Sequence, residues 1–222
     1  MNPIRTITEI RYKDPAQQFT FISGIIRAVG GNPPSSNQLL FGGSVQIRLK
    51  EKRVMVFAEP RRFALNIEDN MTTDQLKNFI NDMAMKVNNH LQWGQMQRIG
   101  IRTFWVKEVN DLDKLVSTSK DILFKENSLL DEAIDVALPL TLVNGDEKIN
   151  YNFGPMKKQQ LVQQFLNFKD AENIPDYFAF IDTDYYGVLD RNFSKNYFRE
   201  FLNRAFEVSE KKVNETISIL KI

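Results

Sequence analysis

QRIGIRTFWVKEV, residues 97–109, is the stretch that decides the fold of this chain. Its apolar and polar residues alternate, which predicts a strand with one buried face. The apolar set is Ile99, Ile101 and Trp105. The set between them is Arg98, Gly100 and Arg102. A strand of this length, with arginines on its second face, indicates a sheet that is covered on one side only.

Shorter strands and one helix precede this stretch. Residues 4–12 alternate as a half-buried strand does, and three further strands are predicted at 45–49, 53–57 and 63–67. Thr72 or Thr73 can cap a helix that runs to about Leu91. The apolar positions of that helix fall on one stripe, so it can cover one face of the sheet.

The second half of the chain follows a similar plan. Residues 133–143 and 147–153 flank Asn144-Gly145, a pair typical of tight hairpin turns. An aromatic, apolar strand is predicted at 177–186, and a long final helix begins near Ser194. Short helical pieces are expected within 111–132 and 159–168.

These elements predict an α+β protein with mixed or antiparallel sheets and helices covering one face. We expect two similarly built lobes, residues 1–110 and 111–222, or one continuous domain spanning both. With 222 residues, 42% of them hydrophobic and 17 of them Phe, the chain is long enough and apolar enough for either arrangement.

The near-neutral total charge conceals an asymmetry between the halves. Residues 1–110 carry 15 Lys and Arg against 9 Asp and Glu, a net of +6. The remaining residues carry 14 against 19, a net of −5, and the two sum to the formal +1. Such a division points to an anionic partner, or to a basic face that meets an acidic one.

Composition excludes several chemistries. Cysteine is absent, which removes disulfides, thiolate metal sites and cysteine nucleophiles. The single histidine, His90, stands at the predicted end of a helix. A catalytic triad that needs a histidine therefore has no candidate other than His90. No apolar run is long enough to span a bilayer and the first residues lack a secretory leader, so we expect a cytoplasmic protein without membrane contact.

Basic residues mark the polar face of the predicted sheet. If the apolar residues of the strands point to the core, the alternate positions point away from it. The predicted partner-binding residues are Arg48, Arg62, Arg98, Gly100 and Arg102. Arginines on a sheet can hold phosphates or carboxylates through charge-assisted contacts, and Gly100 would admit a close approach to the backbone. The alternative is a solvated or salt-bridged face with no ligand.

A pair of carboxylates is the main acidic feature. Asp182 and Asp184 are two residues apart at the end of a predicted strand, which places both on the same face. Hard cations such as Mg²⁺ or Ca²⁺ bind such oxygen ligands, so these residues form a candidate metal site. The alternative is a strand end that turns into solvent.

Four short motifs lie at residues 3–12, 98–102, 181–185 and 206–209. Together they resemble a sporadically distributed family of uncharacterised bacterial proteins of similar length. Members open on a Pro-Ile strand, carry an Arg-Ile-Gly-Leu-Arg-Tyr-like strand after a helix, and finish on a helix. This sequence has Thr103-Phe104 where the family tends to show Tyr-Ile or Tyr-Val. The family implies no known activity, and its scattered distribution implies an accessory role in a bacterial conflict or defence system.

The residues favour binding over catalysis. We expect a non-enzymatic accessory protein, without a cofactor or catalytic residues, that binds an acidic protein surface or a second copy of itself. One alternative is a metal-dependent phosphoryl- or nucleotide-processing enzyme that uses a divalent cation on Asp182 and Asp184. Another is a nucleic-acid-binding protein, which would need exposed aromatic side chains in addition to the arginines.

Overall fold

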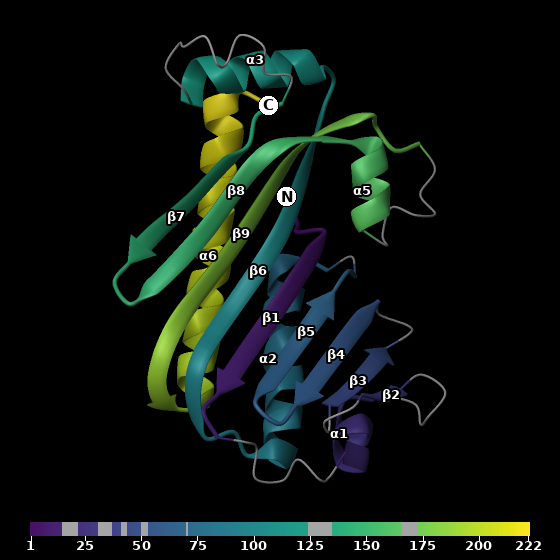
Figure 1. Cartoon of the computed structure of the whole chain (residues 1–222), viewed down its shortest axis with the longest axis vertical. Coiled ribbons are helices and arrows are strands. Elements are labelled where there is room, and N and C mark those ends of the chain that lie inside the picture. The colour runs from purple at the N-terminus through teal and green to yellow at the C-terminus, as the bar shows by residue number, and fades with distance from the viewer. Residues whose placement is uncertain are drawn as a thin grey trace.

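One nine-stranded β-sheet forms the centre of the protein (Figure 1). The computed structural model describes residues 1–14, 22–30, 37–40, 44–49, 53–69, 71–123, 135–165 and 173–222. The strands are β1 Arg5–Tyr12, β2 Asn37–Leu40, β3 Ser44–Leu49, β4 Val54–Glu59, β5 Arg62–Ile67, β6 Gln95–Val109, β7 Leu138–Asn144, β8 Glu147–Lys157 and β9 Tyr177–Asn192. The helices are α1 Ile22–Ala28, α2 Thr73–Leu91, α3 Leu112–Leu123, α5 Lys158–Gln164 and α6 Lys195–Leu220. The α+β class expected from the sequence is confirmed.

The strand order is β2-β3-β4-β5-β1-β6-β9-β8-β7, and each neighbouring pair is antiparallel. The prediction of separate sheets in the two halves is therefore wrong. The reason is the length of β6 and β9, which pair from Gln95 and Asn192 at one end to Val109 and Tyr177 at the other. This long ladder joins the strands of residues 1–110 to those of residues 111–222. The division into two lobes at these bounds stays a prediction.

Helix α2 begins and ends as its sequence directs. The hydroxyl of Thr72 accepts a hydrogen bond from the backbone N–H of Gln75, whose side chain accepts in turn from the N–H of Thr72. This reciprocal capping box satisfies two N–H groups that the first turn leaves unpaired. After Leu91 the chain leaves the helix through Gln92, which has a φ of 50°. The predicted helix is confirmed.

The hairpin of the second half has its turn one residue later than the sequence pattern suggested. Asn144 pairs with Glu147, so the two turn residues are Gly145 and Asp146. Gly145 has a φ of 61°, in the region that glycine enters without a steric penalty. Glycine at the first central position is typical of the type II′ turns that connect twisted strands.

The main core lies between the sheet and the helices α2 and α6, which lie behind the sheet in Figure 1. Leu76, Ile80 and Val87 of α2 and Phe201 of α6 are buried there against strand residues such as Ile99. Helix α5 lies on the opposite side, where Leu161 and Phe165 pack against Phe104 and Phe178. Helices α2 and α6, with α1 packed into the same core, therefore lie on one face as expected, whereas α5 covers one end of the other face.

None of the helices within the described residues combines the length and the apolar character that crossing a membrane requires.

Candidate functional site

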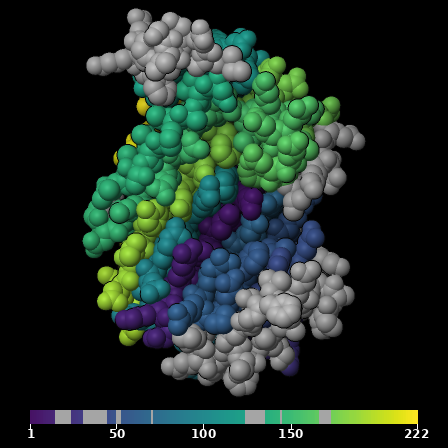
Figure 2. All heavy atoms as spheres, viewed as in Figure 1, coloured from purple at the N-terminus to yellow at the C-terminus, as the bar shows by residue number. Residues whose placement is uncertain are grey.

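The face of the sheet opposite α2 and α6, which we call the open face, carries the predicted arginines. On β6, Ile99 and Ile101 are fully buried under the helices, so Arg98 and Arg102 project from the open face. Strands β1, β6 and β9 are visible at the surface between the β7–β8 hairpin and β3–β5 (Figure 2). The alternation read from the sequence therefore assigned the faces of β6 correctly.

Glu9 of β1 lies at the centre of the open face. Its carboxylate lies 2.6 Å from Arg98 Nη1, 2.8 Å from Arg11 Nε and 3.7 Å from Arg62 Nη1. Arg62 also contacts Glu59, with 2.8 Å between Nη2 and Oε1. Register brings these side chains together, because Arg11 lies opposite Arg62 of β5 on one side and opposite Arg98 of β6 on the other.

Gly100 leaves room for Arg98 to reach across to a second carboxylate. A Cβ atom at Gly100 would lie 3.5 Å from the guanidinium of Arg98 and 3.4 Å from Tyr186 Cβ. Arg98 Nη2 lies 3.3 Å from Asp184 Oδ2, and its Cζ lies 4.8 Å from the centroid of the Tyr186 ring. The space above Gly100, which the sequence suggested for a partner, is thus taken by Arg98.

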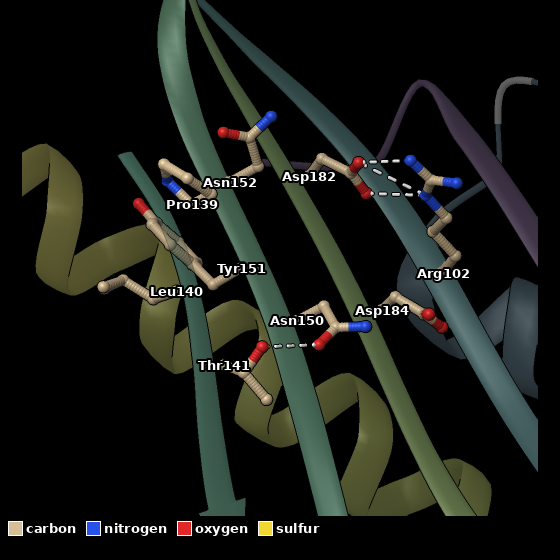
Figure 3. A pocket seen from close by; sticks show the side chains of 9 residues that line it. All are labelled: Arg102, Pro139, Leu140, Thr141, Asn150, Tyr151, Asn152, Asp182 and Asp184. Carbon is tan, nitrogen blue, oxygen red and sulfur yellow. Dashed lines mark hydrogen bonds and ion pairs between the residues drawn. The ribbon is translucent and has the colours of Figure 1, made fainter. Parts of the chain in front are cut away.

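Arg102 and Asp182 form the best-defined ion pair of the open face. Arg102 Nη2 lies 2.6 Å from Asp182 Oδ2 and Nε lies 2.9 Å from Oδ1, so the contact is bidentate (Figure 3). The hydrogen bond to Asp182 is the main reason why the pKa of Arg102 lies above its usual value. The ring of Phe104 lies beneath the guanidinium, 4.9 Å from Cζ to centroid. Arg102 is held in place but 48% exposed, whereas Asp182 is 11% exposed.

Asp182 and Asp184 share a face, as their spacing predicted, and both line a hollow of about 410 Å³. The other polar side chains of this hollow are Arg102, Thr141, Asn150 and Asn152 (Figure 3). Burial raises the pKa of the Asp184 carboxyl, and the positive charges of Arg98 and Arg102 offset this only in part.

A cation at this hollow would have to compete with a guanidinium. Within the described ranges, no group of three or more His, Asp or Glu residues converges as a metal site does. Asp182 already accepts two charge-assisted contacts from Arg102, so a cation would have to displace them. The two aspartates could contribute oxygens to a cation that brings its other ligands from water or from a substrate.

The open face is close to electrically balanced at its centre. Four arginines meet four carboxylates in two groups of contacts, which we together call the charge network. One group links Arg11, Arg62, Arg98, Glu9, Glu59 and Asp184, and the other is the Arg102–Asp182 pair. Arg48 lies in the same row as Arg102 but four strands away, a separation of about 19 Å. The structure therefore groups three of the four predicted arginines and leaves Arg48 apart.

Sequence reasoning missed Glu9 and its role. Arg5, Glu9 and Arg11 occupy alternate positions of a strand that was predicted correctly, so the pattern placed a carboxylate among the arginines. Register, which determines that Glu9 lies opposite Gly100, is not visible in the sequence.

A second cluster, Glu147 with Arg204 and Tyr185, was also missed. Arg204 Nη2 of α6 lies 2.7 Å from Glu147 Oε1, and the phenol of buried Tyr185 donates to the other carboxylate oxygen. Burial opposes ionisation of Glu147, but the hydrogen bonds from Arg204 and Tyr185 outweigh it and hold the pKa of Glu147 below its usual value. These contacts join α6 and β9 to the first residue of β8, at the turn of the β7–β8 hairpin.

A comparison with models of known protein families finds no match to this chain, and a comparison with curated proteins finds none either.

Proposed function

We propose that this chain is a binding protein whose open face docks a protein surface that carries carboxylates. The observation that carries the proposal is the Arg102–Asp182 pair. Asp182 and Phe104 hold the guanidinium in one orientation, yet about half of the Arg102 side chain remains exposed. A donor that is ordered before binding loses less conformational entropy when a partner arrives.

The rest of the charge network supports the same use. Arg11 is 52% exposed and contacts Glu9 through Nε, so its two terminal nitrogens take no part in that contact. An arginine fixed by one carboxylate retains further N–H groups for a second acceptor. Such groups fix the register of a complex and its association rate more than its affinity.

The mixed charge of the face favours protein over nucleic acid. A nucleic-acid backbone carries a phosphate at every step, so on Arg98 and Arg102 it would also lie against Glu9, Asp182 and Asp184, which repel it. A protein surface can place single carboxylates at the arginines and neutral or basic groups at the acidic positions. The aromatic rings beside the arginines, Phe104 and Tyr186, have guanidinium groups over them, so those faces are not free for stacking with bases.

A metal-dependent enzyme that uses Asp182 and Asp184 has less support. Asp182 is engaged by Arg102, so catalysis would need that pair to open when a cation binds. The contacts of Arg98 with Glu9 and Asp184 pair these charges with one another along the surface of the sheet. They do not converge on a point at which a substrate would react.

A capture experiment with matched variants tests the proposal. Tagged wild-type protein and Arg102→Gln are used to capture partners from native lysate, and bound protein and nucleic acid are both identified. Lys86→Gln is the control, because Lys86 is 45% exposed, is paired with Asp82 and lies on α2 behind the sheet. We expect the wild type and Lys86→Gln to capture the same protein and Arg102→Gln to lose it. Equal capture by all three would contradict the proposal.

A further inference from the structure

Strand β7 forms one edge of the sheet and carries no charged residue. Its sequence is Leu138-Pro139-Leu140-Thr141-Leu142-Val143-Asn144. Edge strands of monomeric proteins commonly carry lysines, prolines or bulges that prevent pairing with another strand, and of these β7 has Pro139 near its start. The opposite edge strand, β2, has four residues against seven for β7.

Apolar side chains gather along this edge. Leu140 is 40% exposed and Val143 69% exposed, and Ile219 near the end of α6 is 50% exposed. The leucines of β7 and the last turns of α6 enclose an apolar hollow of about 270 Å³. Four of the six large exposed apolar residues among the described residues lie on β7 or on the helix ends beside it: Ile122, Leu140, Val143 and Ile219. The other two are Met1 and Val188.

The backbone groups on the free side of β7 follow from the hairpin turn. In a hairpin with a two-residue turn, the residues flanking the turn exchange both backbone hydrogen bonds, and the direction then alternates along the strand. Asn144 is the flanking residue, so the backbone groups of Leu142 and Leu140 also point to β8. Those of Thr141 and Val143 point outward, and Pro139, which also points outward, has no N–H to donate.

The outward groups are symmetric about Leu142. If a second β7 lies antiparallel with its Leu142 opposite the first, Thr141 of each copy pairs with Val143 of the other. Each of these two pairs exchanges two hydrogen bonds, so all the outward N–H and C=O groups of Thr141 and Val143 are satisfied. A two-fold axis of this kind is the commonest symmetry of protein dimers.

We propose that β7 is a dimerisation edge, at which a second copy of this chain pairs antiparallel about Leu142 and extends the sheet. The observations that carry it are the uncharged edge, the exposed Leu140 and Val143, and the self-complementary donors and acceptors around Leu142. One paired strand buries less than the about 1,600 Å² of a standard interface, so the dimer is weak and forms at micromolar concentrations or above. Residues of β7 line the hollow beside Asp182 and Asp184, but none of them belongs to the charge network and the pairing uses the backbone of the outer side of β7. The proposal therefore does not depend on the proposed function.

Sedimentation velocity over a range of protein concentrations tests the proposal. We expect the wild type to shift from monomer to dimer, and Val143→Lys to weaken dimerisation by about tenfold or more, because each copy brings a lysine into the interface. Val188→Lys is the matched control, since Val188 is 65% exposed on β9, away from the edge, and should dimerise as the wild type does. A wild type that stays monomeric at every concentration would overturn the proposal, as would Val143→Lys dimerising normally.

The register has its own test, because the chain contains no cysteine. Leu142→Cys places two thiols directly opposite each other across the two-fold axis, so oxidation should give a disulfide-linked dimer. Leu140→Cys is the control, because Leu140 would lie opposite Asn144 of the other copy. Cross-linking of Leu140→Cys as readily as Leu142→Cys, or of neither variant, would contradict the proposed pairing.

Discussion

Asp182 and Asp184 lie two residues apart on the same face of β9, yet removing the charge of one or the other should affect stability differently. Asp182 accepts a bidentate contact from Arg102 with N···O distances of 2.6 Å and 2.9 Å. Asp184 has a single contact with a guanidinium, at 3.3 Å from Arg98, and burial raises its pKa. We therefore predict that Asp182→Asn lowers the free energy of unfolding, whereas Asp184→Asn leaves it unchanged or raises it.

The magnitude for Asp182→Asn follows from the exposure of the pair. Hydrogen bonds to charged groups contribute about 1.5–3 kcal/mol when buried, and exposed ion pairs contribute about 0–1 kcal/mol. Asp182 is nearly buried but Arg102 is about half exposed, and Asn keeps one oxygen as an acceptor. We expect a loss of about 1–2 kcal/mol, which moves the urea midpoint down by about 0.5 M for a slope of about 3 kcal/mol per M.

The pH dependence of the Asp184 variant has a definite sign. Because the pKa of Asp184 is raised in the folded protein, its contribution to stability is present below the ordinary value of 3.8 and is lost as pH rises through the folded value. Any gain from Asp184→Asn should therefore be largest at pH 7 and shrink towards pH 4. Urea titrations of both variants at the two pH values measure this. An equal loss of stability for both variants at pH 7 would refute the reasoning.

Three further predictions concern other parts of the fold. Glu147→Gln should destabilise the protein at pH 7 but not well below pH 4.5, because the lowered pKa of Glu147 gives a contribution that is lost on acidification; urea titrations at both pH values check this. Burial and the hydrogen bond to Glu147 raise the pKa of Tyr185 to about 12, so in an absorbance titration of the wild type this phenol should ionise near pH 12 rather than near pH 10.

 Replacement by Phe should accordingly leave the absorbance change near pH 10 unaltered and remove a change near pH 12. Thr72→Ala removes the hydroxyl that caps α2 and should cost about 1 kcal/mol in a urea titration, whereas Thr72→Ser should cost little.

Local pattern was sufficient to predict most elements of the fold. Alternation identified β1 and the faces of β6, and the capping threonines identified the start of α2. Pattern could not show that the halves share one sheet, because the pairing of β6 with β9 joins residues that are about eighty positions apart in the chain. The alternation within a strand shows which of its residues are buried, but it does not show which strand lies beside it.

The sequence predicted on which face of a strand each residue of the candidate site lies, but it did not predict the contacts between these residues. Arg98 and Arg102 were assigned to the face opposite the helices, and Asp182 and Asp184 to one face of their own strand. That these two sets meet follows from register, which places Arg102 directly opposite Asp184 and Phe104 opposite Asp182. The same limitation hid Glu9, whose position opposite Gly100 makes it the acceptor for several arginines. The sequence therefore indicated a basic face, whereas the structure has a charge network.

The central claim is that the open face binds a partner through its ordered arrangement of charges. Exchanging one pair, with Arg102→Asp and Asp182→Arg in the same protein, tests this claim most directly. The exchanged pair can still form an ion pair across β6 and β9, so we expect the double variant to be more stable than Asp182→Arg alone. We also expect it to lose the partner that the wild type captures from lysate, because the positions of the charges are reversed. Capture of the same partner with unchanged affinity by the folded double variant would contradict the claim.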